Sequence, residues 1–261
     1  PTLDWYRRQT EAHWDKQLIV WPETAIPAYE DQVFAYLQAL HLAAQSRDTH
    51  ILLGMPVRET HGSRYYNALG VLGDTQRGPD SLYLKRHLVP FGEYLPFRFL
   101  LDPILGFLEI PMSNFSAGEM DKPLVTVGDL EAGVFICFEI AFPGAVREAL
   151  PEAAYLVNIS NDAWFGDSLA PAQHLQMARM RALETGRYVV RATNTGITAI
   201  IEPDGSLQQV LPQFKSGAVV GKIQPVHGET WYSRLGDYPL LVFAMIFLTA
   251  WQRFAVRSET G

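Results

Sequence analysis

The chain has little charge for its length. Of its 261 residues, 21 are Lys or Arg and 28 are Asp or Glu. The charged fraction is 19%, whereas soluble domains usually have about 25%. A net charge of −7 argues against a protein that binds nucleic acid through a basic face. A hydrophobic fraction of 48% excludes a disordered chain.

Cysteine is also scarce, since Cys137 is the only one. A disulfide scaffold is therefore excluded. The sequence has no internal repeat and no low-complexity linker, and its length suits one large domain or two small ones. It begins with Pro1 rather than Met. We therefore interpret it as a processed form or a fragment, which a signal peptide or an N-terminal membrane segment could precede.

Short apolar runs alternate with segments of helical spacing. Helices are predicted at 2–16, 31–47, 143–150 and 170–187. Buried strands are predicted at 17–21, 50–57, 65–72, 81–84, 133–138, 154–160, 188–192, 197–202, 207–211 and 218–223. The turn Pro203-Asp204-Gly205 predicts a hairpin. Buried strands interleaved with helices indicate an α/β fold in which helices cover sheets.

The segment 97–110, FRFLLDPILGFLEI, is unusually apolar. Nine of its fourteen residues are large and apolar, and Pro103 and Gly106 interrupt it. One interpretation is an insertion folded onto the core. The other is an apolar arm or lid beside an apolar substrate.

The C-terminal region contains fifteen consecutive uncharged residues, at 238–252. As a helix this run is roughly 22 Å long, shorter than a bilayer core of about 30 Å, so length alone favours a buried helix. The flanks favour the opposite interpretation. Aromatic residues lie at both ends of the run, as at membrane interfaces, and Arg253 and Arg257 follow it. We therefore predict a transmembrane helix with a cytoplasmic C-terminus.

The single cysteine is a candidate nucleophile. Cys137 closes the apolar run 133–137 and comes just before a predicted helix near Pro143. A thiolate at such a strand-to-helix turn can be exposed, and nearby backbone N–H groups can hold an oxyanion. The alternative is a buried free cysteine that acts as a small apolar side chain. The position of Cys137 alone leaves both open.

A cysteine nucleophile needs a group that accepts its proton, and histidine is the usual partner. None of the histidines lies in an obvious strand-end context; they are His13, His41, His50, His61, His87, His174 and His227. Glu23, which follows a predicted buried strand, could be a general base. Lys85 follows the strand 81–84 and could donate to an oxyanion. Taken singly, Glu23 also fits a turn carboxylate, Lys85 a solvated lysine and Glu93 a surface charge.

Together these residues match a known pattern. They lie in WPET at 21–24, YLKRHLVPFGEYLP at 83–96 and ICFEIAFP at 136–143. In this order the three stretches resemble the Glu–Lys–Cys triad of the nitrilase, or carbon–nitrogen hydrolase, superfamily. NISNDAWFG at 158–166 and the stretch 177–205 resemble the segments that follow the nucleophile in that superfamily. The resemblance covers about residues 15–225.

Within the superfamily, the chain is most similar to the apolipoprotein N-acyltransferase family of bacterial envelopes. The motifs are HLVPFGEYLP, PMSNFSAG at 111–118, SNDAWFG and QMARMRALE. The resemblance implies an α-β-β-α sandwich at 1–230, with an apolar arm at about 95–112 and a C-terminal transmembrane helix at 231–257. The family's N-terminal membrane bundle is not in this sequence, and we expect the first strand of the domain just ahead of Pro1.

The resemblance also implies roles for individual residues. Glu23 is the expected general base, Lys85 the oxyanion stabiliser and Cys137 the nucleophile, with the Phe138 N–H as a second oxyanion donor. Glu93 and Glu139 are expected to support them. We further expect Lys85 to lower the thiol pKa. The side chains expected to flank the acyl chain are those of Phe99, Leu101, Phe107, Trp164 and Phe165.

The implied reaction moves the sn-1 acyl chain of a membrane phospholipid, through a Cys137 thioester, to the N-terminal amine of an S-diacylglyceryl-cysteine apolipoprotein. The partners are therefore a phospholipid donor, an apolipoprotein acceptor and the lipid bilayer, without nucleic acid. We expect no cofactor and no metal. The implied location is the bacterial inner membrane, with the catalytic domain on the periplasmic face.

Two other functions stay open. A soluble amidase of the same superfamily would use the same three residues to hydrolyse a small C–N substrate. The apolar arm and the C-terminal run argue against it. A non-catalytic lipid-binding or scaffold protein could also use this fold, although the intact set of Glu23, Lys85 and Cys137 argues against that.

Overall fold

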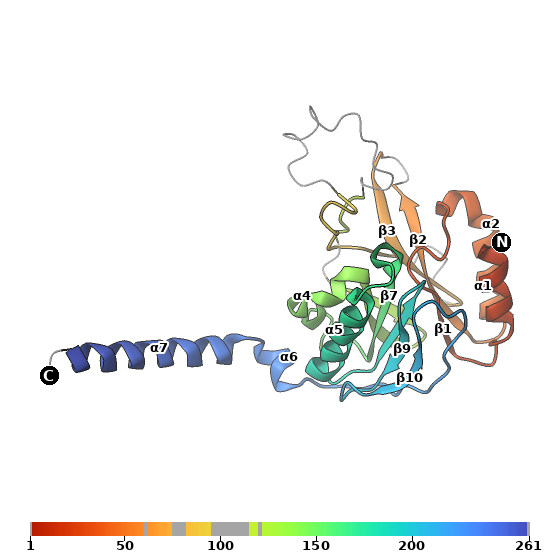
Figure 1. Ribbon diagram of the computed structural model, residues 1–261. Helices are drawn as coiled ribbons and strands as arrows, with labels where there is room; N and C mark the ends of the chain where they lie inside the picture. The colour runs from red at the N-terminus through yellow and green to blue at the C-terminus, as the bar shows by residue number, and fades with distance from the viewer. Residues whose placement is uncertain (1, 60–61, 75–81, 95–114, 120–121, 260–261) are drawn as a thin grey trace, which may run out of the picture.

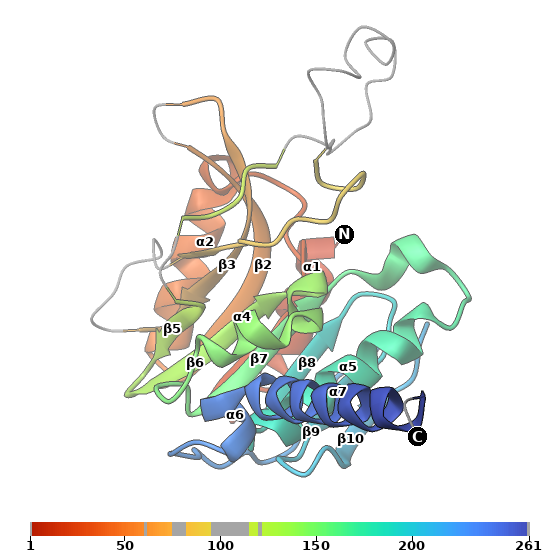
Figure 2. The ribbon, with the colours of Figure 1, turned by 90° about the vertical axis from the view of Figure 1, so that its left-hand side faces the viewer.

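The computed structural model describes residues 2–59, 62–74, 82–94, 115–119 and 122–259, with residues 253–259 described by their backbone alone. Two β-sheets lie face to face, and helices cover the outer face of each (Figures 1 and 2). The four layers α-β-β-α agree with the predicted sandwich. The predicted arm lies entirely outside the described residues, since 95–114 are not among them.

The first sheet has the order β1-β2-β3-β4. Its strands are β1 (Leu18–Val20), β2 (His50–Arg58), β3 (Tyr65–Leu72) and β4 (Leu82–Leu84). β1 is parallel to β2, and the other pairs are antiparallel. Helices α1 (Thr2–Glu11) and α2 (Glu30–Gln45) cover its outer face, where Ile51 and Leu53 pack against Leu37. Leu52, between them, faces the other sheet. Burial on both faces explains why β2 is apolar throughout.

The second sheet has the order β10-β9-β8-β7-β6-β5. Its strands are β5 (Leu124–Val127), β6 (Leu130–Ile136), β7 (Tyr155–Ser160), β8 (Val189–Thr193), β9 (Thr198–Ile201) and β10 (Leu207–Leu211). The central strands β6, β7 and β8 are parallel. Helices α4 (Pro143–Arg147) and α5 (Ala170–Thr185) cover the outer face, where Phe135 packs against Ala178 and Ala182. Val134 and Ile136 point the other way, into the core between the sheets.

Two short 3₁₀-helices begin where the parallel strands end. η1 (Cys137–Ala141) follows β6 directly, and η2 (Asp162–Phe165) follows β7 after one residue, Asn161. Because parallel strands end at the same edge of a sheet, these two helices lie together. This edge is where the candidate functional residues meet.

The structure corrects two sequence predictions. The segment 218–223 is not a strand. The Gln208 side chain donates to the backbone O of Lys222 at 2.9 Å and accepts from its N at 3.1 Å, so a side chain takes the place of a strand ladder there. β5 was not predicted, although it pairs with β6. The hairpin of β9 and β10 is confirmed.

The C-terminal segment forms α6 (Trp231–Leu235) and α7 (Tyr238–Glu259), and α7 extends away from the sandwich (Figure 1). In the part of the chain that the structure describes, no helix is long and apolar enough to cross a membrane. α7 coincides with most of the predicted membrane-spanning segment 231–257, but the side chains after Gln252 lie outside the described residues, so the span itself stays a prediction.

Candidate active site

Cys137 lies at the sharp turn between β6 and η1. Its φ of +52° is in the left-handed region, which costs a non-glycine residue about 1 kcal/mol or more. Asn158 on β7 holds this turn, since its Nδ2 donates to the carbonyl of Phe135 at 2.9 Å and to that of Cys137 at 3.4 Å. The predicted strand-to-helix turn is therefore present, and only 9% of Cys137 is exposed.

Glu23 lies in the turn after β1 and is 5% exposed. Its Oε1 accepts from Asn67 Nδ2 at 2.7 Å and from Lys85 Nζ at 3.5 Å, and its Oε2 accepts from the backbone N of Asn161 at 2.7 Å. The backbone is also held, because Asn194 donates to the Glu23 carbonyl at 2.7 Å. Residues from both sheets therefore fix this carboxylate.

Lys85, which follows β4, is 1% exposed. Its Nζ donates to Glu93 Oε1 at 2.8 Å, in addition to Glu23. Burial alone would lower the pKa of Lys85, but the negative charges of Glu23 and Glu93 raise it above its ordinary value. Lys85 is therefore an ammonium at neutral pH. Glu93 is held in turn by Asn67 at 3.0 Å and by the backbone N of Val89 at 2.8 Å.

The thiol interacts electrostatically with this pair, and its pKa is not the one expected from the sequence. Burial, and next the charge of Glu23, raise the pKa of Cys137 to about 12. The charge of Lys85 and a hydrogen bond with Ser160 lower it by less. Lys85 thus lowers the thiol pKa as expected, but burial outweighs the ammonium and the net pKa is raised. Among the carboxylates, Glu23 has the largest effect on the pKa of this thiol.

Glu139 joins η1 to the loop after β4. It is 1% exposed, and its carboxylate accepts from the Tyr83 hydroxyl at 3.0 Å and from three backbone N–H groups. These N–H groups belong to Ile136 at 2.7 Å, Arg86 at 2.7 Å and His87 at 3.0 Å. Glu139 therefore ties the residue before Cys137 to the residues after Lys85. Burial raises the pKa of Glu139, and the three backbone hydrogen bonds oppose this.

Aromatic side chains lie exposed beside these two turns. Phe138 is 37% exposed and meets Phe142 edge-on, with 5.0 Å between ring centroids. Trp164 and Phe165 on η2 are 75% and 46% exposed. Three other predicted substrate contacts, Phe99, Leu101 and Phe107, lie outside the described residues.

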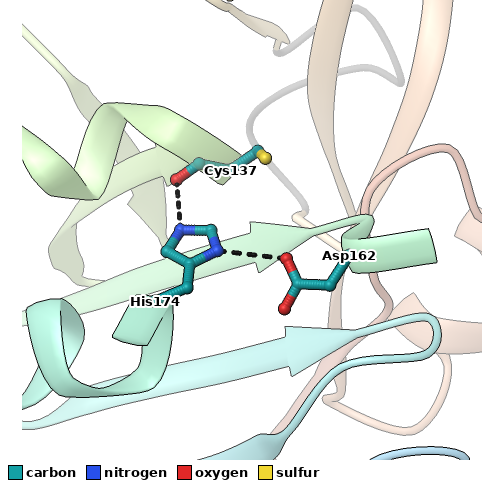
Figure 3. A group of neighbouring side chains, drawn as sticks. All are labelled: Cys137, Asp162 and His174. Carbon is teal, nitrogen blue, oxygen red and sulfur yellow. Dashed lines mark hydrogen bonds and ion pairs between the residues drawn. The ribbon is translucent and has the colours of Figure 1, made fainter. Parts of the chain in front are cut away.

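The sequence reasoning missed a buried polar cluster behind Cys137. His174 on α5 lies between Asp162 and the Cys137 carbonyl (Figure 3). Asp162 also accepts from Arg191 Nη2 at 2.8 Å and from Ser160 Oγ at 2.7 Å. His174 has no strand-end context in the sequence, so its position in the chain does not point to this cluster. The sequence signal that could have indicated this cluster is Asp162, an acidic residue that comes just after a fully buried strand.

This cluster has the residue types of a metal site. One ligand atom from each of Cys137, Asp162 and His174 lies within 4.8 Å of the others. The contacts favour a different arrangement. Both ring nitrogens of His174 are engaged, one by Asp162 and one by the Cys137 carbonyl, each at 3.0 Å. The Cys137 sulfur points away from the ring (Figure 3).

The fold and this site define a class of protein. A protein-family model described as carbon-nitrogen hydrolase matches residues 4–232. The chain therefore belongs to the carbon–nitrogen hydrolase family. The family resemblance drawn from the three sequence blocks is confirmed.

Individual relatives show a more specific similarity than the family model does. The chain is 47% identical, over 92% of its length, to a Methylococcus capsulatus protein named apolipoprotein N-acyltransferase. It is 42% identical over 95% of its length to a protein of that name from Coxiella burnetii, and 41% identical over 94% to one from Pseudomonas aeruginosa. It covers 47%, 50% and 48% of these proteins. The chain thus spans about half the length of the relatives it matches.

Solved structures share the fold at low identity. An amidase of the nitrilase superfamily from Nesterenkonia AN1 matches with a TM-score of 0.58 and 20% identity, over 83% of this chain and 81% of that one. A carbon-nitrogen hydrolase from Helicobacter pylori G27 matches with a TM-score of 0.61 and 16% identity, over 81% and 78%. These matches support the nitrilase-like α/β sandwich.

Proposed function

We propose that residues 1–230 form the catalytic domain of an apolipoprotein N-acyltransferase, with Glu23 as general base, Lys85 as oxyanion stabiliser and Cys137 as nucleophile. The observation that carries the activity is the 47% identity over 92% of the chain to a relative of that name. The buried set of carboxylate, ammonium and thiol supports the mechanism.

In the first step, Glu23 takes the thiol proton while Cys137 Sγ attacks the carbonyl carbon of the sn-1 ester of a phospholipid. The ammonium of Lys85 and the N–H of Phe138 stabilise the oxyanion. When the tetrahedral intermediate collapses, the C–O bond breaks and Glu23 returns the proton to the leaving oxygen. The products are a lysophospholipid and a thioester on Cys137.

In the second step, the N-terminal amine of an S-diacylglyceryl-cysteine apolipoprotein attacks the thioester carbonyl. Glu23 takes a proton from this amine, and the C–S bond breaks. The sulfur recovers the proton as a thiol, and an amide is formed. Because donor and acceptor react in turn, a single site can serve both.

The lipid substrates give the exposed aromatic groups a role. Trp164 and Phe165, next to the site, would flank the route of the acyl chain, together with Phe99, Leu101 and Phe107 of the segment 97–110. The protein would act at the bacterial inner membrane, with this domain on the periplasmic face. The exposed apolar side chains of α7 support contact with lipid.

Intact mass spectrometry after incubation with phosphatidylethanolamine tests this function. We expect the mass of one acyl chain to appear on Cys137 and to leave when a diacylglyceryl-cysteine peptide is added. The variant C137S should gain no thioester, and E23Q should gain it much more slowly, whereas the exposed control E148Q should behave as the wild type. Discharge of the adduct by water alone, with hydrolysis of a simple amide, would instead indicate an amidase.

A further inference from the structure

The His174 ring is held between two hydrogen-bond acceptors. Its Nδ1 lies 3.0 Å from Asp162 Oδ1, and its Nε2 lies 3.0 Å from the backbone carbonyl of Cys137 (Figure 3). A carbonyl oxygen can only accept. A carboxylate likewise only accepts, so the protonation state of Asp162 decides that of the ring.

Asp162 is surrounded by donors. Its Oδ1 accepts from Ser160 Oγ at 2.7 Å, and its Oδ2 accepts from the guanidinium of Arg191 at 2.8 Å. Burial alone would raise the pKa of Asp162, but the hydrogen bond from His174 and the charge of Arg191 lower it below its ordinary value. Asp162 is therefore ionised. The carboxylate and the Cys137 carbonyl both receive a hydrogen bond from the ring only if each ring nitrogen carries a hydrogen. The ring is then an imidazolium.

The carbonyl that His174 contacts belongs to a residue with a strained backbone. Cys137 has a φ of +52°, and the direction of its carbonyl is coupled to that backbone conformation and so to the direction of Sγ. Asn158 Nδ2 reaches the same carbonyl at 3.4 Å, a longer contact than the 3.0 Å of His174. His174 thus makes the shorter of these two contacts.

We propose that His174 is a positioning residue, an imidazolium held by Asp162 that fixes the Cys137 carbonyl and so aims the thiol. His174 neither takes the thiol proton nor binds a metal, because its ring has no free lone pair. Asp162 on η2 faces the ring and Arg191 on β8 lies behind Asp162, so one carboxylate lies between two cations. This inference rests on the proposed role of Cys137 as nucleophile.

The ring can be observed in the unaltered protein. After labelling with ¹⁵N-histidine, the His174 signals should show a hydrogen on both ring nitrogens at neutral pH. A ring with one bare nitrogen would overturn the proposal. Because this measurement needs no substitution, it stands even where a variant fails to fold.

Two variants separate positioning from packing. In H174Q the amide nitrogen can still donate to the Cys137 carbonyl, whereas H174F fills the space without a donor. We expect H174F to lower kcat for acyl transfer at least about tenfold, since misplacement of a reacting group by about 1 Å can cost about a hundredfold. The KM for phospholipid should stay within about twofold, because the substrate contacts are unchanged. H174Q should recover most of the kcat.

The control is H41F, which removes another buried histidine, on α2, whose Nδ1 accepts from the backbone N of Gly73. It should lower stability without changing kcat. A folded H174F with the kcat of the wild type would refute the positioning role, provided that C137S is inactive. An active C137S would instead refute the proposed function itself, so the two failures can be distinguished.

Discussion

At the scale of single residues, the site is governed by burial. Lys85, Glu23 and Cys137 are each at most 9% exposed. Charges in such a place are tolerated only in pairs, and Lys85 therefore bonds to both Glu23 and Glu93. For the thiol, the charge of Lys85 offsets the effect of burial only in part, so the thiol is neutral at neutral pH.

The raised thiol pKa predicts how Cys137 reacts with iodoacetamide. Only the thiolate is alkylated, so the rate should rise steadily between about pH 7 and pH 10. An ordinary cysteine would level off near pH 9, since its pKa is about 8.5. The pKa of about 12 leaves no plateau in this range for Cys137. Cys137 is the only cysteine of the chain, so the loss of free thiol measures it directly. A plateau near pH 9 would contradict the burial argument.

The variant E23Q should change two measurements in opposite directions. The charge of Glu23 raises the thiol pKa, so its removal should shift the alkylation profile to lower pH. The same change removes the proposed base, and acyl transfer should fall by about 10²-fold to 10⁴-fold. Unfolding would also expose the thiol and speed its alkylation, so circular dichroism must show that the variant is folded; an unchanged alkylation profile in folded E23Q would contradict the prediction.

At the scale of the elements, β2 passes very close to the turn that carries Glu23. We expect this contact to affect both stability and activity. A Cβ on Gly54 of β2 would lie 2.6 Å from Glu23 Cα and 2.7 Å from Thr24 N, both backbone atoms that cannot rotate away. We expect G54A to cost about 1–3 kcal/mol of stability and also to slow acyl transfer, because the turn must move. In the control G144A, on α4, a Cβ meets nothing within 4 Å. That variant should unfold at the same or a slightly higher urea concentration.

Loss of the Glu139 carboxylate should also lower stability, because this carboxylate connects two elements. Without its carboxylate, the Tyr83 hydroxyl and three backbone N–H groups lose their acceptor in a buried place. We expect E139A to lower the free energy of unfolding in urea by at least about 3 kcal/mol. Glu148 pairs with Arg86 at 2.6 Å but is 45% exposed, so E148A should cost less than about 1 kcal/mol. Equal losses of stability in E139A and E148A would mean that Glu139 does not hold the loop and η1 together.

At the scale of the whole molecule, the sandwich and α7 are nearly independent. α6 is attached to the sandwich, since Arg147 donates to the carbonyls of Ser233 at 2.9 Å and Arg234 at 3.3 Å. The described side chains of α7 are largely exposed; examples are Leu240 at 68%, Phe243 at 67% and Trp251 at 63%. An apolar surface of this extent marks contact with another apolar body.

Truncation after Gly236 tests this separation. The shortened chain should unfold at the same urea concentration and alkylate at the same rate as the full chain, because α7 contributes little to the core. It should also lose binding to phosphatidylethanolamine vesicles in a flotation assay, whereas the full chain floats with them. Equal flotation of the two chains would show that α7 is not the part that contacts lipid.

Most elements were predictable because their patterns are local. The helices at 31–47 and 170–187 and the hairpin at 203–205 are confirmed within a few residues. The predicted strand at 218–223 was wrong because the Gln208 side chain, distant in sequence, binds the Lys222 backbone.

The sequence by itself determined the α/β class, the order of the three motif blocks and the turn at Cys137, because each depends on neighbouring residues. Only the tertiary structure decided the chemical state of the site. The thiol pKa depends on burial between two sheets, and the state of His174 depends on Asp162 and a carbonyl brought from two other elements. The scarcity of charge noted first is a property of composition. Where the few buried charges meet is a property of the fold.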